Sequence, residues 1–136
     1  MRTLSFLVVI TATAALAQAP SYDPVGSMSQ LMIDIIYPTS DALFYIERSA
    51  PKTEVEWNAI RNQALMLAES GNLLLMPGRV REKGNWVQDS KMMIAAARDA
   101  FKATLAKDMN GVLAQSDRLS ESCIACHKEY RPNYGK

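Results

Sequence analysis

The stretch Cys123-Ile124-Ala125-Cys126-His127 lies near the end of the 136-residue sequence and contains both cysteines and the only histidine of the chain. C-x-x-C-H is the pattern for covalent attachment of a c-type haem. If the segment is helical, Cys123, Cys126 and His127 share one face, because residues three and four apart are neighbours on a helix. Two thiols could then bond the edge of the macrocycle while the imidazole ligates its iron. The motif predicts one covalently attached haem c, with Cys123 and Cys126 binding the macrocycle and His127 binding the metal.

Three other uses of cysteine compete with this interpretation. A closed zinc site usually has four protein ligands, whereas Cys and His supply only three here, so a carboxylate would have to complete the set. A thioredoxin-type dithiol would follow a strand and begin a helix, whereas this motif lies near the end of a helical pattern. A structural disulfide suits an exported protein but does not require the following histidine. Haem attachment is favoured, and a Cys-pair redox protein is the non-haem alternative.

The first residues have the pattern of a secretory signal peptide: a positive charge, an apolar run and small residues that end at Ala19. Cleavage after Ala17 is preferred, because cleavage after Ala19 would leave Pro20 directly behind the cut. The alternative is a retained membrane anchor, but the apolar run is short for a bilayer-spanning helix. We expect residues 1–17 to be removed and residues 18–136 to form the mature domain. Export fits the motif, since bacteria attach haem covalently outside the cytoplasmic membrane, and it predicts a periplasmic location.

The composition is that of one domain without a strong net charge. The sequence has 15 Lys and Arg residues and 14 Asp and Glu residues, and removal of residues 1–17 takes away only Arg2 among them. No basic face suggests a nucleic acid partner, and no other segment is long and apolar enough for membrane contact after cleavage. The longest linker, residues 77–84, carries Arg79, Arg81 and Lys83, which are expected to be solvated loop charges, with contact to a haem propionate as the alternative. Residues 18–136 are enough for one core around a buried cofactor.

Helical periodicity covers most of the mature chain. Four helical segments are expected, at about residues 25–48, from after Pro51 to Met76, at 85–107 and at 110–130. No run alternates as a strand would. Four helices of similar length with short connections are typical of an up-and-down bundle. The sequence predicts an all-α fold, an antiparallel four-helix bundle with a C-terminal haem-attachment motif.

Local signals refine the expected helices. Pro38 lies inside the first one and predicts a kink or break there, because proline lacks an N–H and clashes with the carbonyl four residues earlier. Thr53 and Glu56 have the spacing of a capping box at the start of the second helix. Asn85 and Gln88 have the same spacing at the start of the third. These signals predict where two of the helices begin.

The layout resembles class II c-type cytochromes, the cytochrome c′ family. These are four-helix bundles with C-x-x-C-H near the C-terminus, and this chain carries a similar extended signature, Cys123-x-Ala125-Cys126-His127-x-x-Tyr130-Arg131. The resemblance implies haem c with His127 as the proximal ligand and Arg131 near the proximal haem face. A surface arginine near a helix C-terminus, where positive charge is favourable, explains Arg131 equally well.

The side of the haem opposite His127 separates two functions in this family. Cytochromes c′ proper leave the sixth iron position open and bind small gases, whereas low-spin relatives use a methionine of the first helix. A thioether favours Fe(II) and raises the potential, which suits electron transfer. Met28 and Met32 share one face of the first expected helix, and Gln30-Leu31-Met32 resembles the setting of the ligating methionine. Met32 is therefore the first candidate, with Met28, an open site or a core-filling role as alternatives.

Nothing else in the sequence has the pattern of an enzyme active site. It has no second histidine, no nucleophile–base pair and no Gly-rich phosphate loop, and Trp86 and Tyr130 are expected to pack in the core or against the haem. We expect a periplasmic monohaem c-type cytochrome that carries single electrons between redox partner proteins. The alternative is a five-coordinate, cytochrome c′-like binder of nitric oxide or carbon monoxide. The sequence leaves open whether the protein forms a homodimer.

Overall fold

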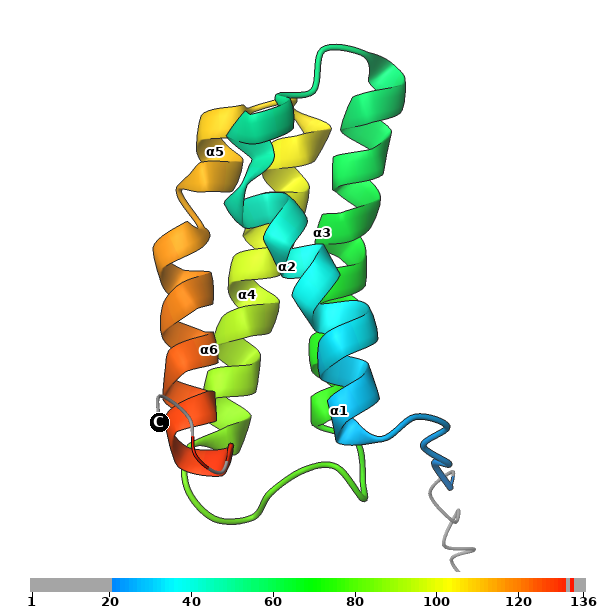
Figure 1. The fold of residues 1–136 in the computed structure, drawn as a ribbon, viewed down its shortest axis with the longest axis vertical. Coiled ribbons are helices and arrows are strands. Elements are labelled where there is room, and N and C mark those ends of the chain that lie inside the picture. Colours follow the sequence, from blue (N-terminus) through cyan, green and yellow to red (C-terminus); the bar gives the residue numbers. More distant parts are fainter. Residues whose placement is uncertain (1–20, 132, 134–136) are drawn as a thin grey trace, which may run out of the picture.

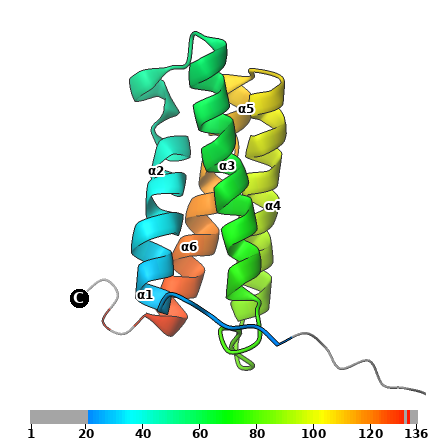
Figure 2. The same cartoon turned by 90° about the vertical axis from the view of Figure 1, so that its right-hand side faces the viewer.

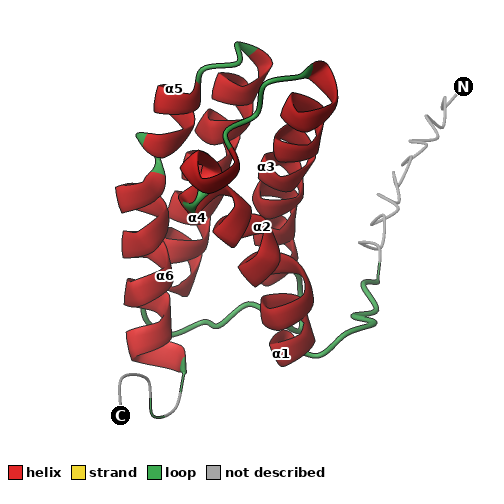
Figure 3. Ribbon diagram, turned by 45° about the horizontal axis from the view of Figure 1, so that its top comes forward, coloured by secondary structure: helices red, strands yellow, loops and turns green. Residues whose placement is uncertain are grey.

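The computed structural model of the chain describes residues 21–131 and 133. These residues form helices joined by loops, without a strand, so the predicted all-α fold is confirmed (Figure 3). No helix in this part of the chain is long and apolar enough to cross a membrane. The predicted signal peptide, residues 1–17, and its cleavage site lie outside the described residues.

The helices run along the long axis of the molecule, and the chain reverses direction at each long connection (Figures 1 and 2). One column holds α1, η1, α2 and η2, and α3, α4 and the α5–α6 segment lie beside it. In Figure 1, α1 and the end of α6 lie at the same lower end of the molecule. The described elements are α1 (Met28–Gln30), the π-helix η1 (Leu31–Ile36), α2 (Tyr37–Phe44), the 3-10 helix η2 (Ile46–Ser49), α3 (Glu54–Leu74), α4 (Trp86–Leu105), α5 (Met109–Leu113) and α6 (Ser116–Tyr130).

The first column passes Pro38 without a break. Residues 28–44 are helical throughout, but η1 has π-helical hydrogen bonding, and the N–H of Tyr37 donates to the carbonyl of Met32 five residues earlier. Because Pro38 cannot donate a hydrogen bond and crowds the carbonyl four residues before it, a wider turn at this point accommodates its ring. The expected irregularity is thus a π-helical segment directly before the proline. The α-helix ends at Phe44, earlier than predicted.

The helix α3 begins with the predicted capping box. The N–H of Glu56 donates to Thr53 Oγ1 at 3.3 Å, and Glu56 Oε2 accepts from the N–H of Thr53 at 2.9 Å. Near the other end of α3, Gly71 lies against α4, where an added Cβ would overlap the Ile94 side chain and approach Met93 Cε to 3.1 Å. The glycine therefore permits a close approach of α3 and α4.

The start of α4 corrects the second capping prediction. Asn85 makes no side-chain cap, so the box expected for Asn85 and Gln88 is wrong. The N–H of Asn85 instead donates to Glu129 Oε2 at 3.3 Å, and the N–H of Trp86 donates to Tyr130 Oη at 3.0 Å. The first N–H groups of a helix lack partners inside it, and here side chains from the end of α6 supply them.

The segment predicted as one helix over residues 110–130 is two helices, α5 and α6. Asp108 caps α5, where its Oδ1 accepts from the N–H of Gly111 at 2.9 Å. The helical hydrogen bonding changes at Gln115, because its side chain donates to the Gly111 carbonyl at 3.4 Å while its N–H donates to the Val112 carbonyl three residues earlier. A local side-chain bond of this kind competes with the next helical turn.

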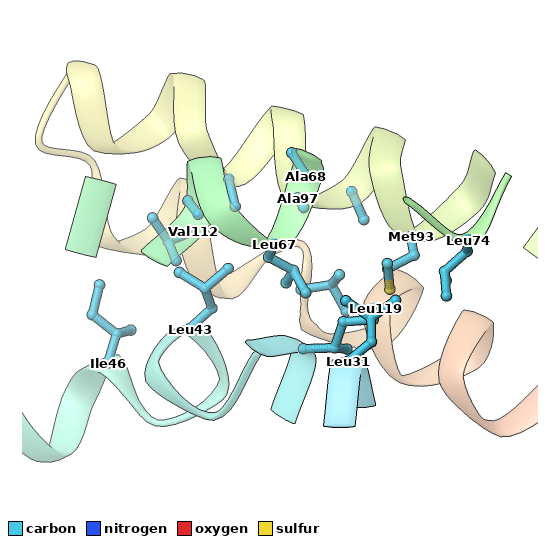
Figure 4. Packing of buried hydrophobic residues seen from close by; sticks show 14 of the residues in the cluster. Leu31, Leu43, Ile46, Leu67, Ala68, Leu74, Met93, Ala97, Val112 and Leu119 are labelled. Atoms are coloured by element: carbon cyan, nitrogen blue, oxygen red, sulfur yellow. The ribbon is translucent and has the colours of Figure 1, made fainter. Parts of the chain in front are cut away.

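Apolar side chains of every long helix meet in one core, shown in Figure 4. Leu67 and Leu119 are almost fully buried, and α4 adds a stripe of small residues that allows its neighbours to approach closely. This stripe consists of Ala96, Ala97 and Ala100, each 0% exposed. The core holds α3, α4 and α6 in fixed relation and so fixes the end of α6 that carries the C-x-x-C-H motif.

Candidate functional site

A cleft of about 680 Å³ opens between the first column and the end of α6. This volume lies within the range of roughly 300–1,000 Å³ typical of pockets for small molecules and cofactors. All the site residues predicted from the sequence line it. They are Met28, Met32, Cys123, Cys126, His127 and Arg131. The two segments are about ninety positions apart in sequence, and the fold brings them together.

The motif lies within the helix α6, as its spacing predicts. Cys123, Cys126 and His127 are each half-buried and face the same cleft. Helical spacing of three and four residues places them on one face. This arrangement allows one flat ligand to be bonded by both sulfurs and approached by the imidazole.

Both thiols are in an environment that keeps them protonated. Burial raises the pKa of the Cys126 thiol to about 11, and the negative charge of Asp89 adds to this shift. Burial also raises the pKa of Cys123. A reactive dithiol needs a lowered pKa, because the thiolate is the nucleophile. The electrostatics of this site therefore weigh against a thioredoxin-like use of the cysteine pair.

His127 is held in its neutral form. Burial lowers the pKa of its imidazole, and the positive charge of Arg131 lowers it further. A neutral imidazole has a free lone pair, which a metal ion requires of a histidine ligand. The backbone N–H of Arg131 donates to the His127 carbonyl at 3.0 Å, and its exposed side chain borders the cleft.

Met32 lies deeper in the site than Met28. Both line the main cleft, but Met32 also lines a second, smaller space of about 40 Å³ that we call the inner cavity. The inner cavity is bordered by Met32, Ile36, Leu74, Asp89, Ser90, Met93, Ser122, Cys123, Cys126 and His127. Met32 thus shares both spaces with the motif, which makes it the better placed of the two thioethers.

Two aromatic residues tie the end of α6 to the rest of the fold. Tyr130 Oη accepts from the Trp86 N–H and donates to the Lys83 carbonyl at 2.6 Å. The two rings meet edge to face with centroids 4.9 Å apart, and Trp86 Nε1 donates to the Leu74 carbonyl at 2.9 Å. Both rings line the cleft. The predicted packing role is consistent with this position, whereas the hydrogen bonds join residues 12, 44 and 47 positions apart and have no local sequence signal.

The sequence reasoning missed two polar residues of the inner cavity. Asp89 and Ser90 are only 5% and 2% exposed, and Asp89 Oδ2 and Ser90 Oγ have no hydrogen-bond partner within the described part of the chain. Burial raises the pKa of Asp89, and the nearby charge of Glu129 raises it further. Both residues lie one turn before Met93 on the buried stripe of α4, so helical periodicity could have identified them.

Two arginines of the linker between α3 and α4 contact other parts of the fold. The guanidinium of Arg81 lies 5.9 Å from the centroid of the Trp86 ring, and Arg79 Nη2 donates to the Gly26 carbonyl at 2.9 Å. These two residues were predicted to be solvated loop charges. Arg79 instead joins the linker to the start of the first column, and Arg81 lies near the ring of Trp86, which lines the cleft.

Among residues 21–131 and 133, no group of three or more His, Cys, Asp or Glu side chains is arranged to hold a metal ion by itself. The candidate site thus consists of a motif on α6, two methionines of the first column and the aromatic pair between them. Comparisons with protein-family models, with curated proteins and with solved structures find no match to this chain.

Proposed function

We propose that the chain is an exported, monohaem c-type cytochrome of the periplasm that carries single electrons between redox partner proteins. In this proposal the helices form an antiparallel four-helix bundle of the class II type. The observation that supports it best is the shared cleft, which is lined by both thiols of the C-x-x-C-H motif, by His127 and by Met32. No family match supports the resemblance, so the proposal depends on the motif and on this cleft.

The residues of the cleft fit a haem c. Each thiol, Cys123 and Cys126, would add across one vinyl group, so that a sulfur–carbon bond forms and the thiol hydrogen moves to the neighbouring vinyl carbon. This addition is redox-neutral and needs no oxidant. His127 would ligate one side of the iron with its neutral imidazole, and Met32 the other with its thioether. The bound cofactor would supply a reversible one-electron change, while the protein fixes the ligands and excludes water.

Met32 decides between electron transfer and gas binding. A thioether in the sixth position stabilises Fe(II), raises the potential and leaves no room for weak external ligands. Met32 lines both the cleft and the inner cavity, a position that favours ligation over mere core filling. If the sixth position were open instead, the same cleft would suit a binder of nitric oxide or carbon monoxide.

The absorption spectrum of the reduced, mature holoprotein tests this proposal. We expect sharp low-spin bands that carbon monoxide leaves unchanged. Met32→Ala should give a high-spin spectrum that shifts on addition of the gas, whereas Met28→Ala, the matched control from the same cleft, should behave like the wild type.

A spectrum of the wild type that already shifts with carbon monoxide would support the gas-binding alternative. An unchanged spectrum for Met32→Ala would remove Met32 from the proposal. A mature chain that is colourless and retains two free thiols would overturn the cytochrome assignment altogether.

A further inference from the structure

The part of α4 that borders the inner cavity contains two polar side chains where apolar ones would be expected. Asp89 and Ser90 lie on the inward face of α4 between Trp86 and Met93, and both are more than nine-tenths buried. Asp89 Oδ2 and Ser90 Oγ have no hydrogen-bond partner among the described residues. Buried polar atoms in folded proteins almost always have a partner, from the protein or from an ordered water. A pair of adjacent unpartnered atoms therefore points to a bound molecule.

The inner cavity provides the space for such a molecule. Both residues line it, and its volume is about 40 Å³. A cavity needs roughly 10–15 Å³ of such space to hold one water. The inner cavity is thus large enough for a molecule of the size of water.

The chemistry of the lining also selects a neutral molecule. No Lys or Arg of the described chain lines the inner cavity, and an anion would be repelled by Asp89. A hard cation prefers about six oxygen ligands or more, whereas only Asp89, Ser90 and Ser122 offer side-chain oxygens here. The other lining groups are apolar or carry sulfur, apart from the His127 imidazole.

Asp89, Ser90 and Ser122 each present a side-chain oxygen to the inner cavity as a partner for a water. Ser122 Oγ donates to the Leu119 carbonyl at 2.7 Å, so its oxygen can still accept a hydrogen bond. A water could donate to Asp89 Oδ2 and to Ser122 Oγ while it accepts from the Ser90 hydroxyl. Buried waters typically make about three hydrogen bonds, which this set supplies.

We propose that Asp89 and Ser90 form a binding site for one internal water molecule in the inner cavity, which Cys126 and Met32 also line. The site is built by α4 and completed by Ser122 of α6. Its polar atoms come from Asp89, Ser90 and Ser122, which are not among the residues proposed to hold the cofactor.

A crystal structure of the mature holoprotein at high resolution tests the site directly. We expect one ordered water within about 3.2 Å of both Asp89 Oδ2 and Ser90 Oγ. If these atoms bond to protein groups or to the cofactor with no water between them, the proposal is wrong.

Oxygen-17 magnetic relaxation, which counts long-lived internal waters in solution, provides the second measurement. Ser90→Val should fill the cavity and remove one such water. Ser70→Ala is the matched control, because Ser70 is equally buried but its hydroxyl donates to the Leu67 carbonyl at 2.8 Å; its water count should equal that of the wild type. An unchanged count in Ser90→Val would contradict the site.

Haem content measured on the same samples keeps the two proposals apart. A colourless protein that retains the water would overturn the cytochrome assignment and leave this site standing. A protein that contains haem but lacks the water would overturn this site and leave the cytochrome assignment standing. If Ser90→Val does not fold, the wild-type crystal structure decides the matter alone.

Discussion

Replacing Trp86 by Phe should destabilise the protein more than the same change at Trp57, although both tryptophans are nearly buried, at 3% and 7% exposed. Both substitutions lose a similar part of the indole ring, so this loss cancels in the comparison. Only Trp86→Phe also removes the indole hydrogen bond to the Leu74 carbonyl at 2.9 Å. Trp57 makes no comparable indole bond among the described residues.

The size of the difference follows from the position of that carbonyl. Leu74 is the last residue of α3, and the last carbonyls of a helix have no partner within it. Without the indole, this carbonyl would be left unpaired beside a buried ring, which costs about 1–3 kcal/mol. The edge-to-face contact with Tyr130 can persist, because a phenyl ring keeps an edge.

Urea denaturation of the mature protein, with the slope m compared among variants, measures this difference. We expect Trp86→Phe to lower the unfolding free energy by about 1–3 kcal/mol more than Trp57→Phe does. For a domain of this size, that corresponds to about 4–12 °C in Tm. Equal losses in the two variants, with unchanged m, would refute the argument that the indole bond joins the cleft to the end of α3.

Three further predictions concern the helix cap and the inner cavity. Thr53→Ala should lower the unfolding free energy by about 1 kcal/mol in urea denaturation, because it removes the side-chain acceptor of the α3 capping box, whereas an effect near zero would contradict this role. The pKa of Asp89 is raised above its ordinary value of 3.8, so the folded state binds the proton more tightly and stability is lost as pH rises above that value. Asp89→Asn should therefore gain stability over the wild type as the pH rises above 3.8, measured as two denaturation series over pH, and a difference that does not change with pH would contradict this. If the haem proposal is correct, Ser90→Val should raise the midpoint potential in a redox titration, because it makes the surroundings of the iron less polar; an unchanged or lowered potential would contradict this.

The parts of the fold that depend on nearby residues could be predicted from the sequence. The capping box of Thr53 and Glu56 is a contact over three residues, and the structure contains it. The π-helical segment before Pro38 was anticipated only as an irregularity, because the way in which a helix accommodates a proline depends on the packing around it. The division at Gln115 was missed, since a glutamine that binds the carbonyl four residues earlier has no distinctive pattern.

In the site too, local contacts could be predicted from the sequence, whereas contacts between distant segments could not. The shared face of Cys123, Cys126 and His127 follows from helical spacing alone. The capping of α4 by Glu129 and Tyr130 requires two segments 44 residues apart to meet, which periodicity cannot foresee. Asp89 and Ser90 stand at buried positions of a predicted helix, so their burial could have been predicted from periodicity. The cavity that they line could not have been predicted in this way.

The two walls of the cleft are held in different ways, and this bears on how a ligand could be bound. Tyr130 fixes the end of the α6 wall through hydrogen bonds with the Trp86 N–H and the Lys83 carbonyl. The opposite wall contains η1, whose π-helical turn includes Met32. A π-helical turn changes the angular phase between the residues before and after it, and such turns occur frequently at functional sites. The register of the first column relative to α6 therefore depends on η1. If the haem proposal is correct, the α6 wall would bond the edge of the macrocycle, and η1 would set the position of the Met32 thioether on the opposite side.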